Sequence, residues 1–229
     1  MSYLYNALRF AFAVAWCSSV YYDFHYQPRL GFEWYIYKLV MLTNLNFIIL
    51  TIFSLFTVIQ TIIPPTRVLN SAIDYTYHCT IFPVAVVTCL LFWGLYAIDP
   101  QLVMPEWVAE LIPSWLNHVT HTLPLIYVLF ELIFFEKDAP TTKSSLWMAV
   151  THVIIYYVII LSVRFFDEYW LYPLLEIFTW QHHIVAFIAA SIGYYLLIRL
   201  SSVLSKYIHG ANVHIRSKTR KEGEKKKHR

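Results

Sequence analysis

Residues 39–63 read LVMLTNLNFIILTIFSLFTVIQTII, a mostly apolar stretch that contains no charged residue. About 20 consecutive, predominantly apolar residues suffice for a helix to cross the hydrocarbon core of a bilayer. The pattern predicts an all-α, multi-pass membrane protein with about six transmembrane helices in one bundle. The other five stretches lie at 3–21, where Arg9 interrupts the run, and at 75–97, 115–135, 145–165 and 183–204. Arg9 is expected to reach toward the headgroups or to face the bundle interior.

The composition of the 229 residues also favours a membrane protein over a soluble domain. Hydrophobic side chains make up 59% and charged ones 14%, and the mean hydropathy is +0.53. Soluble domains carry about a quarter charged residues. Nine of the seventeen Lys and Arg residues lie from Lys206 onward. We therefore expect one transmembrane domain at 1–205 and a basic, disordered cytosolic tail at 206–229.

The basic tail bears on partners and on location. A run of Lys and Arg can bind nucleic acid, but after a membrane helix it more often faces anionic lipid. No nucleic-acid partner is therefore expected. Lys226 and Lys227 stand four and three residues from the end, as in a dilysine retrieval signal. This favours the endoplasmic reticulum over the plasma membrane.

The charges of the connecting segments predict orientation. Segments 99–114 and 166–182 contain no Lys or Arg, whereas the alternate connections contain several. By the positive-inside rule, the alternate connections face the cytosol together with both termini. The two outer segments each include a stretch that suits a short interfacial helix, at 104–113 and 172–180.

Polar side chains inside an apolar span are costly and usually face the bundle interior, so they are the candidate functional residues. Two groups stand out: Thr43, Asn44 and Asn46 in one span, and Asn117, His118, Thr120 and His121 in another. Thr43 lies four residues from the outer end of its span, which places it about 6 Å deep. His121 lies six residues from the outer end of its own span, about 9 Å deep. We therefore expect the two groups to share one level in the outer leaflet.

Spacing places Asn117, His118 and His121 on one helix face, because they are three or four residues apart. Pro124 follows one turn later and cannot continue the helix hydrogen bonding, so a kink beside His121 is expected. Each residue also has a purely structural interpretation. A threonine in a span more often donates its hydroxyl to the carbonyl one turn earlier than it reacts.

A metal site is the second kind of site that we considered for these histidines. His182 and His183 begin the last span at the same outer surface, where His118 and His121 also lie. No carboxylate–histidine pair of known ligand spacing accompanies them. The sequence therefore predicts neither a metal nor a cofactor.

Several short segments resemble a known family. WLNHVTHT at 115–122 is similar to one family signature, and MLTNLNFIILTIF at 41–53 is similar to another. Phe-Pro at 82–83, Phe-Trp at 92–93 and Trp-Leu-Tyr-Pro at 170–173 fit the same pattern in the same order. The family is that of the androgen-induced gene product and the androgen-dependent TFPI-regulating protein.

The resemblance implies a six-helix membrane hydrolase that cleaves fatty acid esters of hydroxy fatty acids. The threonine nucleophile of the family falls on Thr43, and its histidine base falls on His121. Around this pair we expect supporting roles for three residues and a cation that binds the substrate carboxylate. The supporting residues are Asn46, Asn117 and His118, and the candidate cations are Lys38 and Arg164. The alternative is a non-catalytic transporter or lipid-binding protein that uses the same polar cluster. The sequence predicts no oligomeric state.

Overall fold

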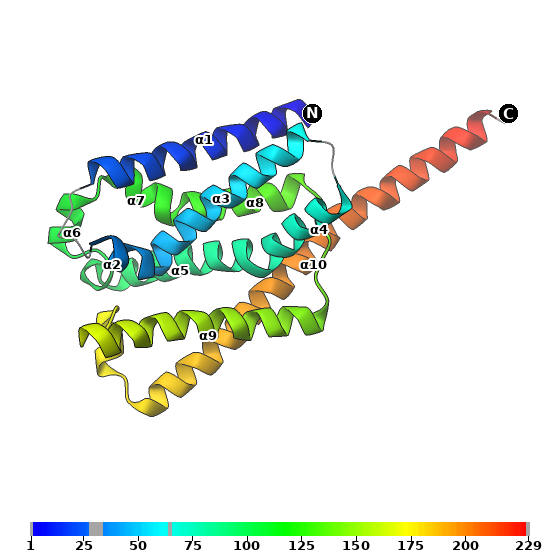
Figure 1. Ribbon diagram of the computed structural model, residues 1–229. Helices are drawn as coiled ribbons and strands as arrows, with labels where there is room; N and C mark the ends of the chain where they lie inside the picture. Colours follow the sequence, from blue (N-terminus) through cyan, green and yellow to red (C-terminus); the bar gives the residue numbers. More distant parts are fainter. Residues whose placement is uncertain (1, 28–33, 64–65, 228–229) are drawn as a thin grey trace.

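The computed structural model describes residues 2–27, 34–63 and 66–227, which are almost entirely helical and include no strand (Figure 1). The all-α prediction is therefore confirmed. The long elements are α1 (Ser2–Tyr26), α3 (Leu42–Ile62), α4 (Arg67–Thr76), α5 (Phe82–Ile98), α7 (Ser114–His121), α8 (Leu123–Phe134), α9 (Thr142–Asp167) and α10 (Trp180–Lys227). The short elements are α2 (Trp34–Val40), the π-helix η1 (Tyr77–Ile81), η2 (Pro100–Leu102), α6 (Glu106–Leu111) and η3 (Pro173–Ile177).

Four helical segments are long and apolar enough to cross a membrane. They are α3, the continuous rod Arg67–Ile98 formed by α4, η1 and α5, then α9, and the part of α10 from Trp180 to Gly210. The predicted count of six is therefore not confirmed. α1 has 25 residues but is less apolar than these four. α7 and α8 have only 8 and 12 residues because the span predicted at 115–135 is broken between them. α1 and the pair formed by α7 and α8 nevertheless lie alongside α3 in the bundle (Figure 1).

Two apolar cores hold the bundle together. The larger one joins α1, α3, η1, α5, α7 and α8 around the fully buried Trp16, Leu50 and Tyr127. The smaller one joins η1 and α5 to α9 and α10 around Ala149 and Ile198. Many large apolar side chains lie outside both cores, among them Ile52, Val158 and Ile192. An apolar outer surface over apolar helices is that of a membrane protein.

The helix ends differ from the predictions at two places that matter for function. The span predicted at 39–63 is divided into α2 and α3 at Met41, whose ψ of 133° is extended. The span predicted at 115–135 is divided at Thr122, so the kink predicted beside His121 is confirmed. The short helices predicted in the outer segments are also confirmed, as α6 and η3. α2 and α6 lie at the same end of the bundle (Figure 1).

A buried charge cluster lies near the opposite end. Arg9 donates from Nε and Nη2 to the two carboxylate oxygens of Glu131, both at 2.7 Å. Lys137 Nζ donates to Glu131 Oε2 at 2.8 Å. Glu131 is completely buried, and Arg9 and Lys137 are 3% and 5% exposed. Arg9 therefore faces the bundle interior and does not reach toward the headgroups, which was the other alternative.

α10 continues as a backbone helix to Lys227, and its last turns project away from the bundle (Figure 1). The side chains from residue 211 onward lie outside those described. The expected disorder of the tail at 206–229 therefore stays a prediction.

Candidate active site

Thr43 and His121 meet although they are 78 positions apart in the chain. Thr43 lies in the first turn of α3, and His121 is the last residue of α7. Thr43 Oγ1 lies 3.2 Å from His121 Nε2, within hydrogen-bond distance. The two polar groups that the sequence places at one depth thus come from adjacent helices and face each other.

The second ring nitrogen fixes the tautomer of His121. Nδ1 lies 3.0 Å from the backbone oxygen of Asn117, one turn earlier in α7. A carbonyl only accepts, so Nδ1 must carry the proton and donate, and Nε2 keeps its lone pair toward Thr43. The Thr120 hydroxyl, also 3.0 Å from Nδ1, is consistent with this assignment because it donates to backbone carbonyls of α7. The ring is thus set as a proton acceptor for the Thr43 hydroxyl.

An aromatic ring holds the imidazole plane. Phe92 of α5 stacks on His121 with centroids 3.6 Å apart and an interplanar angle of 18°. His118, by contrast, contacts Thr122 Oγ1 at 3.1 Å and stacks on Trp93 at 5.4 Å. Of the predicted supporting residues, Asn117 therefore contacts His121 through its backbone, while the ring of His118 contacts Thr122 and Trp93. Sequence reasoning missed Phe92, although the Phe-Trp pair at 92–93 was part of the family resemblance.

Asn46 lies one turn below Thr43 on α3 and is only 1% exposed. Neither its amide nitrogen nor its amide oxygen has a hydrogen-bond partner among the described residues. A buried amide without a partner is costly and calls for an explanation. Asn46 is thus a buried polar side chain, three residues after Thr43 in α3, whose hydrogen-bonding capacity is not used by the described residues.

Two tyrosines tie the start of α3 to the other half of the bundle. The backbone N–H of Leu42 donates to Tyr156 Oη at 3.0 Å, and Tyr156 Oη lies 2.6 Å from Tyr172 Oη. Burial raises the pKa of Tyr172, which lies in the segment after α9, so it stays a neutral phenol. The hydroxyl pair satisfies a helix N–H that has no acceptor within its own helix. It also fixes the turn that carries Thr43.

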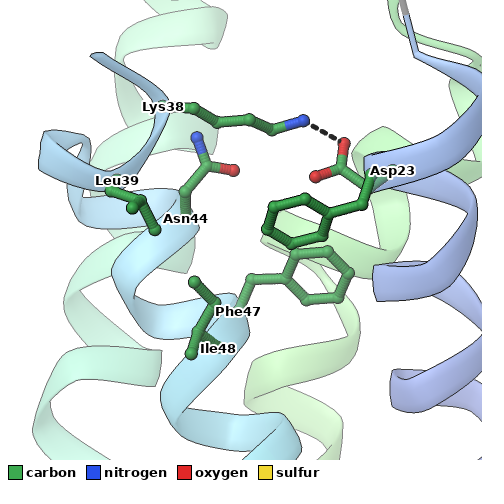
Figure 2. A pocket seen from close by; sticks show the side chains of 7 residues that line it. Asp23, Lys38, Leu39, Asn44, Phe47 and Ile48 are labelled. Atoms are coloured by element: carbon green, nitrogen blue, oxygen red, sulfur yellow. Dashed lines mark ion pairs between the residues drawn. The ribbon is translucent and has the colours of Figure 1, made fainter. Parts of the chain in front are cut away.

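The two candidate cations differ in position. Lys38 Nζ pairs with Asp23 Oδ1 at 2.5 Å above a pocket floored by Leu39, Phe47 and Ile48, with Asn44 on its wall. Figure 2 shows this ion pair spanning the pocket from α2 to α1. Arg164 instead donates to the Glu168 backbone oxygen and lies over the Trp170 ring. Lys38 therefore shares a pocket with Asn44, the residue that directly follows Thr43 in α3.

The histidines considered for a metal do not gather. His183 stacks on Trp170 at 4.9 Å, and His118 stacks on Trp93. Among the residues that the structure describes, no three His, Cys, Asp or Glu side chains are grouped to hold a metal ion.

The sequence matches a family model for FAR-17a/AIG1-like proteins over residues 6–206. The chain belongs to this family. The androgen-induced gene 1 protein of Homo sapiens is 31% identical over 135 residues, which cover 59% of this chain and 57% of the relative. The human androgen-dependent TFPI-regulating protein is 29% identical over 138 residues, 58% and 60% of the two chains.

A third FAR-17a/AIG1-like relative, the androgen-dependent TFPI-regulating protein of Mesocricetus auratus, is 32% identical over 80 residues, 35% of each chain. The chain thus aligns with about three fifths or less of the length of these relatives. No solved structure matches it. The family predicted from the sequence motifs is confirmed, and because the relatives' names state no reaction, the reaction is a proposal.

Proposed function

We propose that this member of the FAR-17a/AIG1-like family is an integral-membrane hydrolase that cleaves the ester bond of fatty acid esters of hydroxy fatty acids. Thr43 is the nucleophile and His121 is the base. The observation that carries the proposal is the 3.2 Å contact between Thr43 Oγ1 and the acceptor nitrogen of His121. A threonine hydroxyl becomes a useful nucleophile when an adjacent base takes its proton.

The hydrogen bonding of the other threonines in α3 argues against a purely structural Thr43. Thr51, Thr57 and Thr61 each donate to a backbone carbonyl three or four residues earlier, at 2.7–2.8 Å. This is the usual arrangement of a hydroxyl in an apolar helix. Thr43 lies in the first turn, and its hydroxyl turns to an imidazole instead.

The reaction is acyl transfer in two steps. His121 Nε2 takes the Thr43 proton while Oγ1 attacks the ester carbonyl carbon, and the hydroxy fatty acid leaves with the proton from His121. Water then attacks the acyl-threonine, with His121 as base again, and releases the fatty acid. The Asn46 amide and the positive N-terminal end of α3 stabilise the negative charge on the carbonyl oxygen.

The site suits a substrate that stays in the bilayer. Thr43 lies in the first turn of α3, which follows α2, and His121 ends the short helix α7, which follows α6. The end of the bundle that carries α2 and α6 is seen in Figure 1. We place this end on the outer side and both ends of the chain in the cytosol, by the loop charges. A fatty acid ester with its carboxylate at the headgroups holds its ester group several carbons below, at this depth. Localisation to the endoplasmic reticulum stays a prediction.

The experiment that tests this function uses the wild-type protein in membranes. Cells expressing it should hydrolyse a fatty acid ester of a hydroxy fatty acid, and a long-chain alkyl fluorophosphonate should label it covalently. Peptide mapping should place the label on Thr43. The alternative is a transporter or lipid-binding protein. In that case the ester is not cleaved, the protein is not labelled, and the lipid crosses the membrane or binds to the protein unchanged.

Replacing Asp23 with asparagine should sharpen preference for a free carboxylate. The change removes the Asp23 carboxylate that competes with the substrate carboxylate for Lys38, so we expect KM for the carboxylate substrate to fall about fivefold, which corresponds to ~1 kcal/mol. KM for the methyl ester of the same substrate should not change. Glu110→Gln, an exposed acid of α6 at the same end, is the matched control. An equal shift for both substrates would show that Lys38 does not bind the carboxylate.

A further inference from the structure

A second threonine–histidine pair lies in the smaller core, away from the site described above. Thr80 Oγ1 is 3.0 Å from His152 Nε2. His152 Nδ1 is 2.8 Å from the backbone oxygen of Met148, one turn earlier in α9, so Nδ1 carries the proton and donates. Nε2 therefore presents its lone pair to the Thr80 hydroxyl. The ring stacks on Tyr194 of α10 at 5.2 Å and 23°.

Each part of this arrangement repeats the pair formed by Thr43 and His121. In both, a hydroxyl faces Nε2, the carbonyl four residues earlier holds Nδ1, and an aromatic ring from a neighbouring helix stacks on the imidazole. The two pairs share no helix segment, since one is built on α3 and α7 and the other on η1 and α9. They are two separate threonine–histidine pairs with the same arrangement of contacts.

The backbone around Thr80 explains why its hydroxyl does not make the usual bond to its own helix. Thr80 lies in the π-helix η1, where the N–H of Phe82 bonds to the oxygen of Tyr77, five residues earlier. Such single π-turns inside α-helices occur often at functional sites. On α10, by contrast, Ser191 and Ser202 donate to carbonyls four residues earlier.

The second pair lies within the hydrocarbon core. His152 is seven residues into the span predicted at 145–165, about 10 Å from the end that the loop charges place at the cytosol. Thr80 and His152 are both half-buried, and Thr151, Ile154 and Ile155 beside them on α9 are exposed. A molecule dissolved in the bilayer core can therefore approach the pair from the side.

We propose that Thr80 and His152 form a second nucleophilic site that takes neutral esters without a headgroup, such as an ester of a long-chain alcohol and a fatty acid. These molecules place their ester group in the hydrocarbon core, where the outer site has no access to it. Thr80 Oγ1 attacks the carbonyl carbon, His152 takes the proton, and the long-chain alcohol leaves with that proton. Water then hydrolyses the acyl-threonine and releases the fatty acid.

The test uses a long-chain alkyl fluorophosphonate on full-length protein in membranes, in a Thr43→Ala background. The Thr80 oxygen displaces fluoride from phosphorus, so labelled peptides identify the site. We expect label on the peptide that contains Thr80, reduced tenfold or more by adding Thr80→Val or His152→Gln, and retained with Thr80→Ser. Hydrolysis of the alcohol ester should follow the same order. Thermal melting of each variant identifies any that fails to fold. Thr80→Val keeps the volume of threonine without the hydroxyl, and Thr80→Ser keeps the hydroxyl without the methyl group.

The outcomes separate this inference from the function proposed above. Label on Thr43 of the wild-type protein but none on Thr80 in the Thr43→Ala background overturns the second site and leaves the first intact. Label on Thr80 but none on Thr43 does the reverse. Label on neither residue in folded protein overturns both.

Discussion

Alanine at position 43 or at position 121 is expected to lower the hydrolysis of fatty acid esters of hydroxy fatty acids by a factor of about a thousand or more. Thr43→Ala removes the attacking oxygen, and His121→Ala removes the base, which by itself contributes about 10²–10⁴ in rate. The measurement is kcat in membranes at matched expression. Thr43→Ser keeps a hydroxyl on the same turn and should retain a substantial part of the rate.

The double variant separates a working pair from two independent residues. Residues that act as one unit are strongly non-additive, so Thr43→Ala with His121→Ala should be no slower than either single variant. His121→Gln keeps a polar side chain of similar reach but cannot take a proton at neutral pH, and it should be as inactive as His121→Ala. A Thr43→Ala protein that keeps a tenth of the wild-type rate would rule out Thr43 as the nucleophile.

Asn46 supplies the intermediate case. Loss of one donor to a developing oxyanion costs about 10²–10³ in kcat, so Asn46→Ala should lie between wild type and the pair variants. Its labelling by the fluorophosphonate should persist, because Thr43 and His121 stay in contact. An Asn46→Ala protein that loses labelling altogether would indicate that the amide supports the fold of the site rather than the oxyanion.

The shared level of Thr43 and His121 was predictable because it depends on quantities that a sequence carries, whereas their roles as nucleophile and base follow from the resemblance to the family. The depth of Thr43 and of His121 follows from their distance to the outer end of each span, and the break near Pro124 follows from the missing N–H. The contacts of Phe92 and of the Tyr156–Tyr172 pair depend on which helices pack side by side. That information is tertiary, so these residues remained unassigned although two of them lie in segments that resemble the family.

The fold shows the same division between local and long-range information. Apolar runs predict helices well, and the all-α class follows from them. No proline or glycine marks the break at Met41, so the sequence predicts one helix where the structure has two. Arg9 is conspicuous in an apolar run, but nothing local indicates that Glu131, 122 positions later, is its partner. The second pair, Thr80 with His152, depends on a π-turn that no periodicity reveals.

Replacing Glu131 with glutamine is expected to destabilise the protein by about 3–5 kcal/mol, the largest effect on stability of any single change considered. Glu131 is completely buried, and its carboxylate accepts from both Arg9 and Lys137. Glutamine keeps the shape but removes the negative charge, so two buried cations face each other without an anion. In a protein of this size such a loss lowers Tm by roughly 10 °C.

Thermal melting of purified protein in detergent measures the effect, with Glu110→Gln as the exposed control that should not shift. Because the penalty comes from unpaired charges, removing all three should relieve it. A triple variant with Arg9→Met, Glu131→Leu and Lys137→Met should melt above Glu131→Gln, since apolar replacement of a buried ion cluster is often neutral or stabilising. A triple variant that melts below the single one would mean that the cluster stabilises the bundle through hydrogen bonds to its neighbours, such as Arg9 to Gln60, rather than by charge balance.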